Sequence, residues 1–136
     1  MMVAFTLALA LAAAGQPADA VIGRWKTGNR NGVVQIDRCG NSVCGRLVTS
    51  DGIRTNPALT DANNSDASLR NRPLKGVSLL SGFKAEGGGV WNGGKIYNPE
   101  DGKTYTAKLT PSGDTLKVRG CVFVPLCKTQ TWTRLR

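Results

Sequence analysis

The feature that most constrains the fold is a hairpin pattern over residues 91–105. Two runs rich in aromatic and β-branched residues, 95–97 and 103–105, flank a segment that reads Asn-Pro-Glu-Asp-Gly. Pro99 presets φ for a type I turn, and Gly102 adopts positive φ without a steric penalty. The pattern therefore predicts two antiparallel strands that meet at a tight turn. It indicates a fold and no particular reaction.

Short β-rich runs separated by Gly, Asn, Asp and Pro recur along the chain, and no helical period exceeds two turns. The alternation is clearest where Tyr105, Ala107 and Leu109 share one face of a run. Leu116 and Val118, opposite Lys117 and Arg119, repeat it. On the last run neither face is apolar, because Lys128, Gln130, Trp132 and Arg134 share one face and three threonines the other. The expected strands cover residues 22–27, 33–39, 43–48, 76–84, 88–92, 95–97, 104–110, 115–121 and 128–135. Such spacing favours an all-β fold, a small antiparallel up-and-down barrel of about eight strands, over a sandwich.

The two ends of the chain carry a matching pair of side chains. Trp25 lies on the first expected strand and Arg134 on the last. In a closed barrel these strands are neighbours, so we expect Arg134 to lie across the ring of Trp25 as a cation–π partner. The alternative is that Trp25 and Trp132 are ordinary core residues and Arg134 a surface residue.

One segment, residues 49–73, is too long for a hairpin turn and is rich in Asn, Asp, Ser, Arg and Pro. Loops of this length in compact domains bind ligands, act as lids or are disordered. An EF-hand is excluded because Asp66 stands where the calcium loop needs Gly. We expect Ser65 to cap a helical turn through Leu69, and Arg70 and Arg72 to pair with Asp61 or Asp66.

The N-terminus predicts export. Residues 3–14 are apolar, and Ala18-Asp19-Ala20 is a pattern that signal peptidase accepts. The apolar run is shorter than the roughly 18 to 20 residues that cross a bilayer. We therefore expect a cleaved signal peptide over residues 1–20, one domain over residues 21–136 without a transmembrane segment, and a periplasmic or secreted bacterial product.

The four cysteines form two close pairs in the sequence, Cys39 with Cys44 and Cys121 with Cys127. Four cysteines allow three connectivities, and the two local disulfides are the easiest if each segment is a hairpin. A four-cysteine zinc site is the alternative, since the spacing is close to that of structural zinc sites. An oxidising compartment favours disulfides, so we expect no metal and no cofactor.

Composition and charge exclude several classes of enzyme and indicate the kind of partner. The chain has no histidine, which excludes Ser-His-Asp and Cys-His hydrolases and histidine-bearing zinc catalysis. Its 18 Lys and Arg outnumber 9 Asp and Glu, and removal of Asp19 with the signal peptide raises the net charge from +9 to +10. Such a charge favours anionic partners, although it also serves solubility and protects strand edges. Export argues against nucleic acid as the partner.

Six motifs in a fixed order resemble the exported bacterial proteins known as domain of unknown function 2147. They are Gly23-Arg24-Trp25-Lys26-Thr27, Cys44-Gly45-Arg46-Leu47-Val48, Arg70-Asn71-Arg72-Pro73-Leu74-Lys75-Gly76, the hairpin of residues 91–105, Leu116-Lys117-Val118-Arg119-Gly120 and Thr129-Gln130-Thr131-Trp132-Thr133-Arg134. The resemblance implies a lipocalin-like barrel in the envelope or outside the cell, and it assigns no catalytic residue. The family has Asn-Pro-Asp in the long loop, where this chain has Asn64-Ser65-Asp66.

Our leading hypothesis is a non-enzymatic binding module for a small apolar or amphipathic ligand or an envelope component, with a small apolar or anionic ligand or an envelope protein as the possible partner. An interaction or inhibitor protein that engages another envelope or extracellular protein is the alternative. A hydrolase or isomerase that uses carboxylates or Tyr97 and Tyr105 ranks third. The candidate ligand-binding residues are Asp61, Asn64, Asp66, Arg70, Arg72, Trp91, Lys95 and Tyr97.

Overall fold

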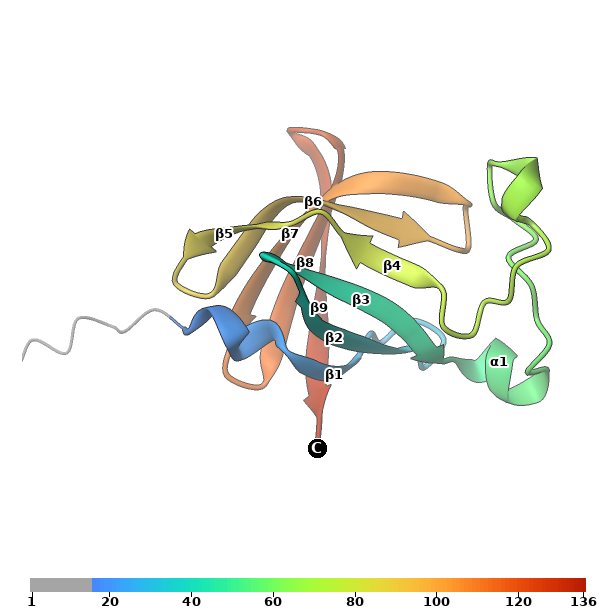
Figure 1. Cartoon of the computed structure of the whole chain (residues 1–136), viewed down its shortest axis with the longest axis horizontal. Coiled ribbons are helices and arrows are strands. Elements are labelled where there is room, and N and C mark those ends of the chain that lie inside the picture. Colours follow the sequence, from blue (N-terminus) through green and yellow to red (C-terminus); the bar gives the residue numbers. More distant parts are fainter. Residues whose placement is uncertain (1–15) are drawn as a thin grey trace, which may run out of the picture.

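The computed structural model describes residues 16–136, which form a closed antiparallel barrel (Figure 1). Its strands are β1 (Gly23–Lys26), β2 (Val33–Cys39), β3 (Ser42–Thr49), β4 (Ser78–Ser81), β5 (Lys84–Gly87), β6 (Val90–Asn98), β7 (Lys103–Ser112), β8 (Thr115–Phe123) and β9 (Leu126–Leu135). Strands pair in the order β4-β3-β2-β1-β9-β8-β7-β6-β5, and pairing of β4 with β6 closes the ring. Eight strands form the barrel, β5 lies outside it along β6, and the predicted fold is confirmed.

The boundaries of three predicted strands were wrong, and glycines explain each case. The run 76–84 is divided into β4 and β5 at Gly82, whose φ is +75°. The runs 88–92 and 95–97 are a single strand, β6, which passes Gly93 and Gly94 as a bulge between Trp91 and Gly94. Glycines permit both a turn and a bulge, and the sequence does not say which.

Within residues 16–136, three short helices accompany the barrel: η1 (Ala18–Val21), α1 (Asp51–Thr55) and η2 (Ala67–Leu69). The last two lie in the long segment between β3 and β4, where the sequence predicted only one helical turn. The carboxylate of Asp66 caps η2 by accepting from the backbone N–H of Ser68, so the predicted cap at Ser65 was wrong by one residue. Residues 1–15 of the predicted signal peptide lie outside the described residues.

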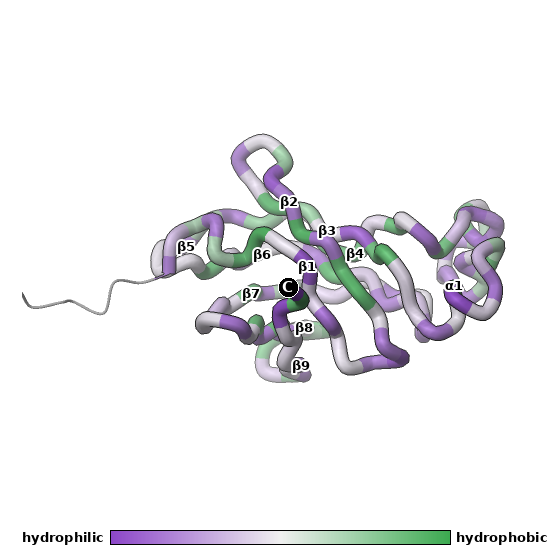
Figure 2. Tube along the Cα trace, turned by 90° about the horizontal axis from the view of Figure 1, so that it is seen from below, coloured by the Kyte–Doolittle hydropathy of each residue, from purple (hydrophilic) through white to green (hydrophobic). Residues whose placement is uncertain are grey.

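Strand alternation places the core as predicted. Ala107 and Leu109 of β7 and Leu116 and Val118 of β8 are buried, whereas Lys117 is exposed. Figure 2 shows hydrophobic stretches along strands such as β3 and mostly hydrophilic residues on the long loop beside α1. Along β7 and β8 the apolar groups therefore face inward, whereas Lys108, Lys117 and Arg119 face outward.

The first and last strands pair, with Trp25 opposite Arg134. The guanidinium of Arg134 lies 4.3 Å from the centre of the Trp25 ring, and its Nη1 donates to the carbonyl of Ile22 at 2.9 Å. A side chain at position 23 would bring its Cβ within 2.8 Å of that Nη1, so Gly23 leaves the space that Arg134 occupies. The pairing expected from the two ends of the sequence is present.

Both local disulfides form, Cys39 with Cys44 at the β2–β3 turn and Cys121 with Cys127 at the β8–β9 turn. The predicted connectivity is confirmed. Among residues 16–136, no helix is both long and apolar enough to cross a membrane.

Candidate functional site

A cavity of about 880 Å³ opens at one end of the barrel. Its walls come from strands on several sides of the ring, from the long loop and from the β1–β2 and β6–β7 turns. Aliphatic and aromatic side chains supply much of the lining, including Leu47, Leu59, Leu74, Leu79, Ile96, Tyr97, Tyr105, Val118, Val122, Leu126 and Trp132. The volume is in the range of pockets that hold one drug-sized molecule, roughly 300 to 1,000 Å³.

The inward-facing residues of β9 become more exposed and more polar from the core to the mouth of this cavity. Trp132 is buried, Gln130 is partly buried and Lys128 is exposed, and all three line the cavity. Gln130 accepts a 3.1 Å hydrogen bond from the indole of Trp132. Within residues 16–136 Lys128 forms no salt bridge. The cavity is thus apolar at depth and cationic at this part of its rim.

Gly120 keeps the middle of the cavity open. It lies opposite Lys128 on the neighbouring strand and lines the cavity. A Cβ at this position would lie 3.5 Å from Cγ2 of Ile96 and 3.8 Å from Cβ of Tyr105, which are ordinary contact distances. A small side chain would therefore fit, whereas a large one would fill the space that a ligand needs.

The long loop is anchored to the barrel through a buried carboxylate. Asp61 is 1 % exposed, and its Oδ1 accepts a 2.7 Å hydrogen bond from the hydroxyl of Tyr97 on β6. Its Oδ2 accepts from Nε of Arg72 at 2.9 Å and from the amide of Asn64 at 2.8 Å. Arg72 also lies over the ring of Tyr97, 5.3 Å from its centre. The predicted pairing of Arg72 with Asp61 is present, and Arg70 instead donates to the carbonyl of Asn64.

These contacts shift the pKa values of Asp61 and Tyr97. Burial, which would raise the pKa of Asp61, is outweighed by hydrogen bonds from Asn64, Tyr97 and Arg72, and the pKa falls below 3.8. Burial and then the hydrogen bond to Asp61 raise the pKa of Tyr97 to about 12. At neutral pH the carboxylate is therefore ionised and the phenol neutral. The pair holds the loop in place and is poorly suited to proton transfer.

The loop also packs on the β6–β7 turn, which is the turn of the hairpin recognised in the sequence. Ser65 donates from both its hydroxyl and its backbone N–H to the carbonyl of Gly102, at 2.6 and 3.1 Å. A Cβ on Gly102 would lie 1.7 Å from the carbonyl oxygen of Asn63. Across the cavity mouth, Arg30 of the β1–β2 loop pairs with Glu100 of this turn at 2.8 Å. These contacts set the shape of the rim.

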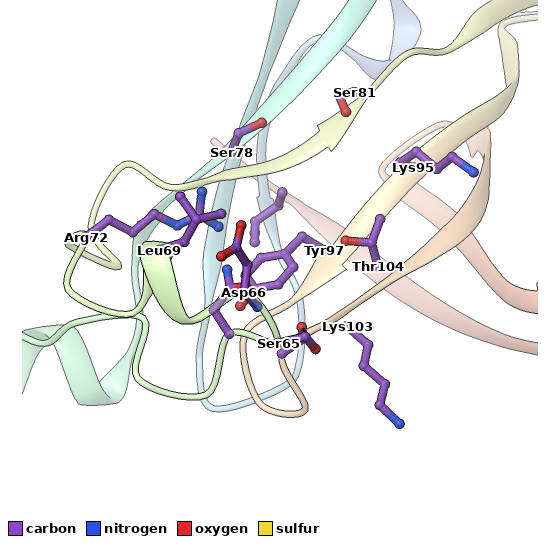
Figure 3. A pocket seen from close by; sticks show the side chains of 13 residues that line it. Ser65, Asp66, Leu69, Arg72, Ser78, Ser81, Lys95, Tyr97, Lys103 and Thr104 are labelled. Carbon is purple, nitrogen blue, oxygen red and sulfur yellow. Dashed lines mark hydrogen bonds between the residues drawn. The ribbon is translucent and has the colours of Figure 1, made fainter.

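A second groove of about 650 Å³ lies outside the barrel, between the loop and the outer faces of β4, β6 and β7. Figure 3 shows Ser78, Ser81 and Thr104 around it, together with Arg72 and Tyr97, while Lys95 and Lys103 extend outward from its edge. Hydrogen bonds from the hydroxyl and backbone N–H of Ser68 lower the pKa of Asp66, which also lines this groove. The groove is more open than the barrel cavity, and apolar side chains such as Leu69 and Leu79 line it beside the polar ones.

The eight candidate residues separate into three groups. Five of them line the outer groove, and Tyr97 also lines the barrel cavity; they are Asn64, Asp66, Arg72, Lys95 and Tyr97. Asp61 and Arg70 hold the loop together. Trp91 lines neither cavity: it is buried, its indole donates to the carbonyl of Ala18, and Arg38 lies 5.3 Å above its ring.

Sequence reasoning missed most of the cavity wall. Val118 was recognised only as an inward-facing residue. Lys128 and Gln130 were recognised only as sharing a face of the last strand with Trp132, and Gly120 only as part of a family motif. Alternation shows which residues point inward, but the same pattern describes a filled core and a cavity wall. Within residues 16–136 no three Cys, Asp or Glu side chains gather closely enough to hold a metal ion.

Comparison with known proteins identifies the family. The profile of a family described as "Uncharacterized protein conserved in bacteria (DUF2147)" matches residues 23–134. The chain belongs to this family. A solved structure described as "Protein HP1028 from the human pathogen Helicobacter pylori belongs to the lipocalin family" is similar to this DUF2147 chain, with a TM-score of 0.75 and 27 % identity over 85 % of this chain and 82 % of that one. No curated protein matches this DUF2147 chain.

Proposed function

We propose that this protein is an exported binding module that holds a small apolar or amphipathic molecule inside its barrel. The observation that carries the proposal is the open cavity of about 880 Å³ with an aliphatic and aromatic lining. Barrels of eight strands are wide enough to hold one small ligand, as lipocalins do. The likeness to a structure described as a lipocalin supports the same use of the cavity.

The polarity of the wall suggests how such a ligand lies. Its apolar part packs toward Trp132 and Val118, and a negatively charged end reaches Lys128 at the mouth. An exposed cation without a carboxylate partner binds an anion with little desolvation penalty. The ligand class is therefore a molecule with one hydrocarbon chain or ring system and a terminal anionic group.

The test uses a probe that fluoresces in apolar sites, N-phenyl-1-naphthylamine, together with dodecanoate as a competitor. We expect saturable binding of the probe and displacement by dodecanoate. Gly120→Phe fills the cavity and lowers probe affinity at least tenfold, whereas Thr131→Phe places the same ring on the outer face of β9 and changes nothing. Lys128→Gln weakens dodecanoate and leaves the neutral probe unaffected. Absence of saturable probe binding, or equal binding by the Gly120→Phe variant, would contradict the proposal.

Two disulfides support a location in the periplasm or outside the cell. We propose that residues 1–20 are a signal peptide, and N-terminal sequencing of the exported protein should then begin at Val21. Stoichiometric capture of one envelope protein, with no probe binding, would favour the alternative of an interaction or inhibitor protein.

A further inference from the structure

The tip of the β8–β9 hairpin is apolar and exposed. It consists of residues 122–126, which read Val-Phe-Val-Pro-Leu. Val122 is 63 %, Phe123 60 %, Val124 70 % and Leu126 57 % exposed. Single exposed apolar residues need no explanation, but four large ones in one turn form a patch of the kind that contacts a partner or a membrane.

The hairpin presents this tip in a fixed shape. Cys121 and Cys127 are paired in register and joined by a disulfide, and Phe123 lies opposite Leu126. The backbone N–H of Cys127 donates to the carbonyl of Pro125 at 2.9 Å. In Figure 1 the tip is the loop at the top, from which β9 runs down to the C-terminus. The disulfide limits the freedom of the loop to fold back onto the barrel.

The wall behind the tip is cationic. Residues 115–136 contain no Asp or Glu. Arg119 lies two residues before Cys121 and directly opposite Lys108 on the outer face of the barrel. Like charges in facing positions on neighbouring strands destabilise a sheet. Within residues 16–136 neither side chain forms a salt bridge, and the buried Nε of Arg119 has no hydrogen-bond partner. An external anion would offset the repulsion between these two cations.

We propose that residues 122–126 insert into the surface of an anionic phospholipid bilayer while Lys108 and Arg119 bind its headgroups. With a rise of about 3.3 Å per residue, the two cations lie roughly 7 Å behind the disulfide and the tip extends a similar distance beyond it. Interfacial segments bury their apolar groups to about 5 to 10 Å, so the spacing matches the depth of the headgroup layer. In a bilayer the anionic headgroups lie outside the apolar chains. The hairpin matches this order, because its cations lie behind its apolar tip.

Docking in this way would connect the membrane with the barrel cavity. Val122, Pro125 and Leu126 belong to the tip and also line the cavity mouth. A molecule leaving the bilayer beside the tip would therefore enter the cavity without crossing open water. This part of the inference rests on the proposed ligand-binding function, whereas docking itself does not.

The test is co-sedimentation of the exported protein with vesicles of phosphatidylcholine alone or with 30 % phosphatidylglycerol. We expect at least tenfold tighter binding to the anionic vesicles, weakened by added salt. The double variant Phe123→Ser and Val124→Ser reduces this binding at least tenfold, as does Lys108→Gln with Arg119→Gln. Lys75→Gln with Lys84→Gln removes the same charge elsewhere and has less than a twofold effect.

Equal binding of the double serine variant, or no binding to either vesicle, would overturn the proposal. A dimer in sedimentation that the serine variant dissociates, without vesicle binding, would instead assign the tip to a second copy of the chain. Phe123 and Val124 lie outside the cavity lining. Probe binding by the serine variant therefore reports on the cavity alone, and failure of docking is distinguishable from failure of ligand binding.

Discussion

The hydroxyl of Tyr97 donates a 2.7 Å hydrogen bond to Oδ1 of Asp61, and this bond joins the barrel to its longest loop. Asp61 precedes Tyr97 by 36 residues in the sequence. Its burial is possible because Tyr97, Arg72 and Asn64 donate hydrogen bonds to its two carboxylate oxygens. A buried carboxylate without such partners would be strongly unfavourable. The loop over the cavity mouth is therefore held by an internal polar cluster.

Tyr97→Phe should destabilise the protein by about 1 to 3 kcal/mol, because Asp61 keeps its burial and loses one donor. Urea unfolding followed by tryptophan fluorescence measures the change. Tyr105→Phe is the matched control, since the Tyr105 hydroxyl bonds to the exposed Asp101; its effect should stay within about 0.5 kcal/mol. Equal effects of the two variants would contradict the anchoring role.

Because the Tyr97 hydroxyl donates to Asp61, we expect the protein to lose stability at alkaline pH. The pKa of Tyr97 is about 12 in the folded protein, against 10.0 for an unperturbed tyrosine. Its contribution is therefore complete below pH 10 and is lost as the pH rises toward 12, by roughly 2 to 3 kcal/mol. The difference in unfolding free energy between wild type and Tyr97→Phe should shrink over this interval. A constant difference from pH 9 to 12 would count against the prediction.

At acid pH the stability of the protein depends on the carboxylate of Asp61. The folded pKa of Asp61 lies below 3.8, so its contribution is present above pH 3.8 and is lost as the pH falls through the folded value. Asp61→Asn should be less stable than wild type at pH 7 and should lose less stability than wild type between pH 4 and pH 2. Acid titration of unfolding in both proteins provides the measurement.

Gly102→Ala should release the loop from the β6–β7 turn. Gly102 has φ of +72°, and a Cβ there would overlap the carbonyl of Asn63. Gly113 has φ of +58° with nothing within 4 Å of its Cβ position, so Gly113→Ala measures backbone strain alone, about 1 to 2 kcal/mol. Gly102→Ala should cost more than Gly113→Ala and should speed proteolysis within residues 56–75. Equal loop proteolysis in both variants would show that the contact is unimportant.

Arg134→Ala should destabilise the barrel closure by roughly 2 to 4 kcal/mol, because it removes the cation over Trp25 and the hydrogen bond to Ile22. Arg136→Ala removes an equal charge two residues later from an exposed pair with Asp114 and should change stability by less than about 1 kcal/mol. Thermal unfolding by circular dichroism compares the two. An equal drop in midpoint would show that only net charge matters.

Local patterns were sufficient for the architecture. Alternation of Ala107 and Leu109 with outward-facing Lys108 determines which side of β7 is buried, because side chains on a strand alternate between faces. The cysteine spacings indicated two local disulfides for a similar reason, since a hairpin brings such close positions together. Glycines were less informative: Gly82 ends a strand while Gly93 and Gly94 continue one through a bulge.

The site depended on contacts between distant segments. Sequence patterns predicted an all-β chain with two local disulfides, a long polar loop and a Trp25–Arg134 closure, because each follows from local geometry or from pairing of the first and last strands. Three features became visible in the folded barrel alone: Asp61 is buried under Tyr97, Gly120 and Lys128 face an open cavity, and residues 122–126 form an exposed tip. Burial and openness depend on what packs opposite a residue, and ring closure supplies that neighbour from far along the chain.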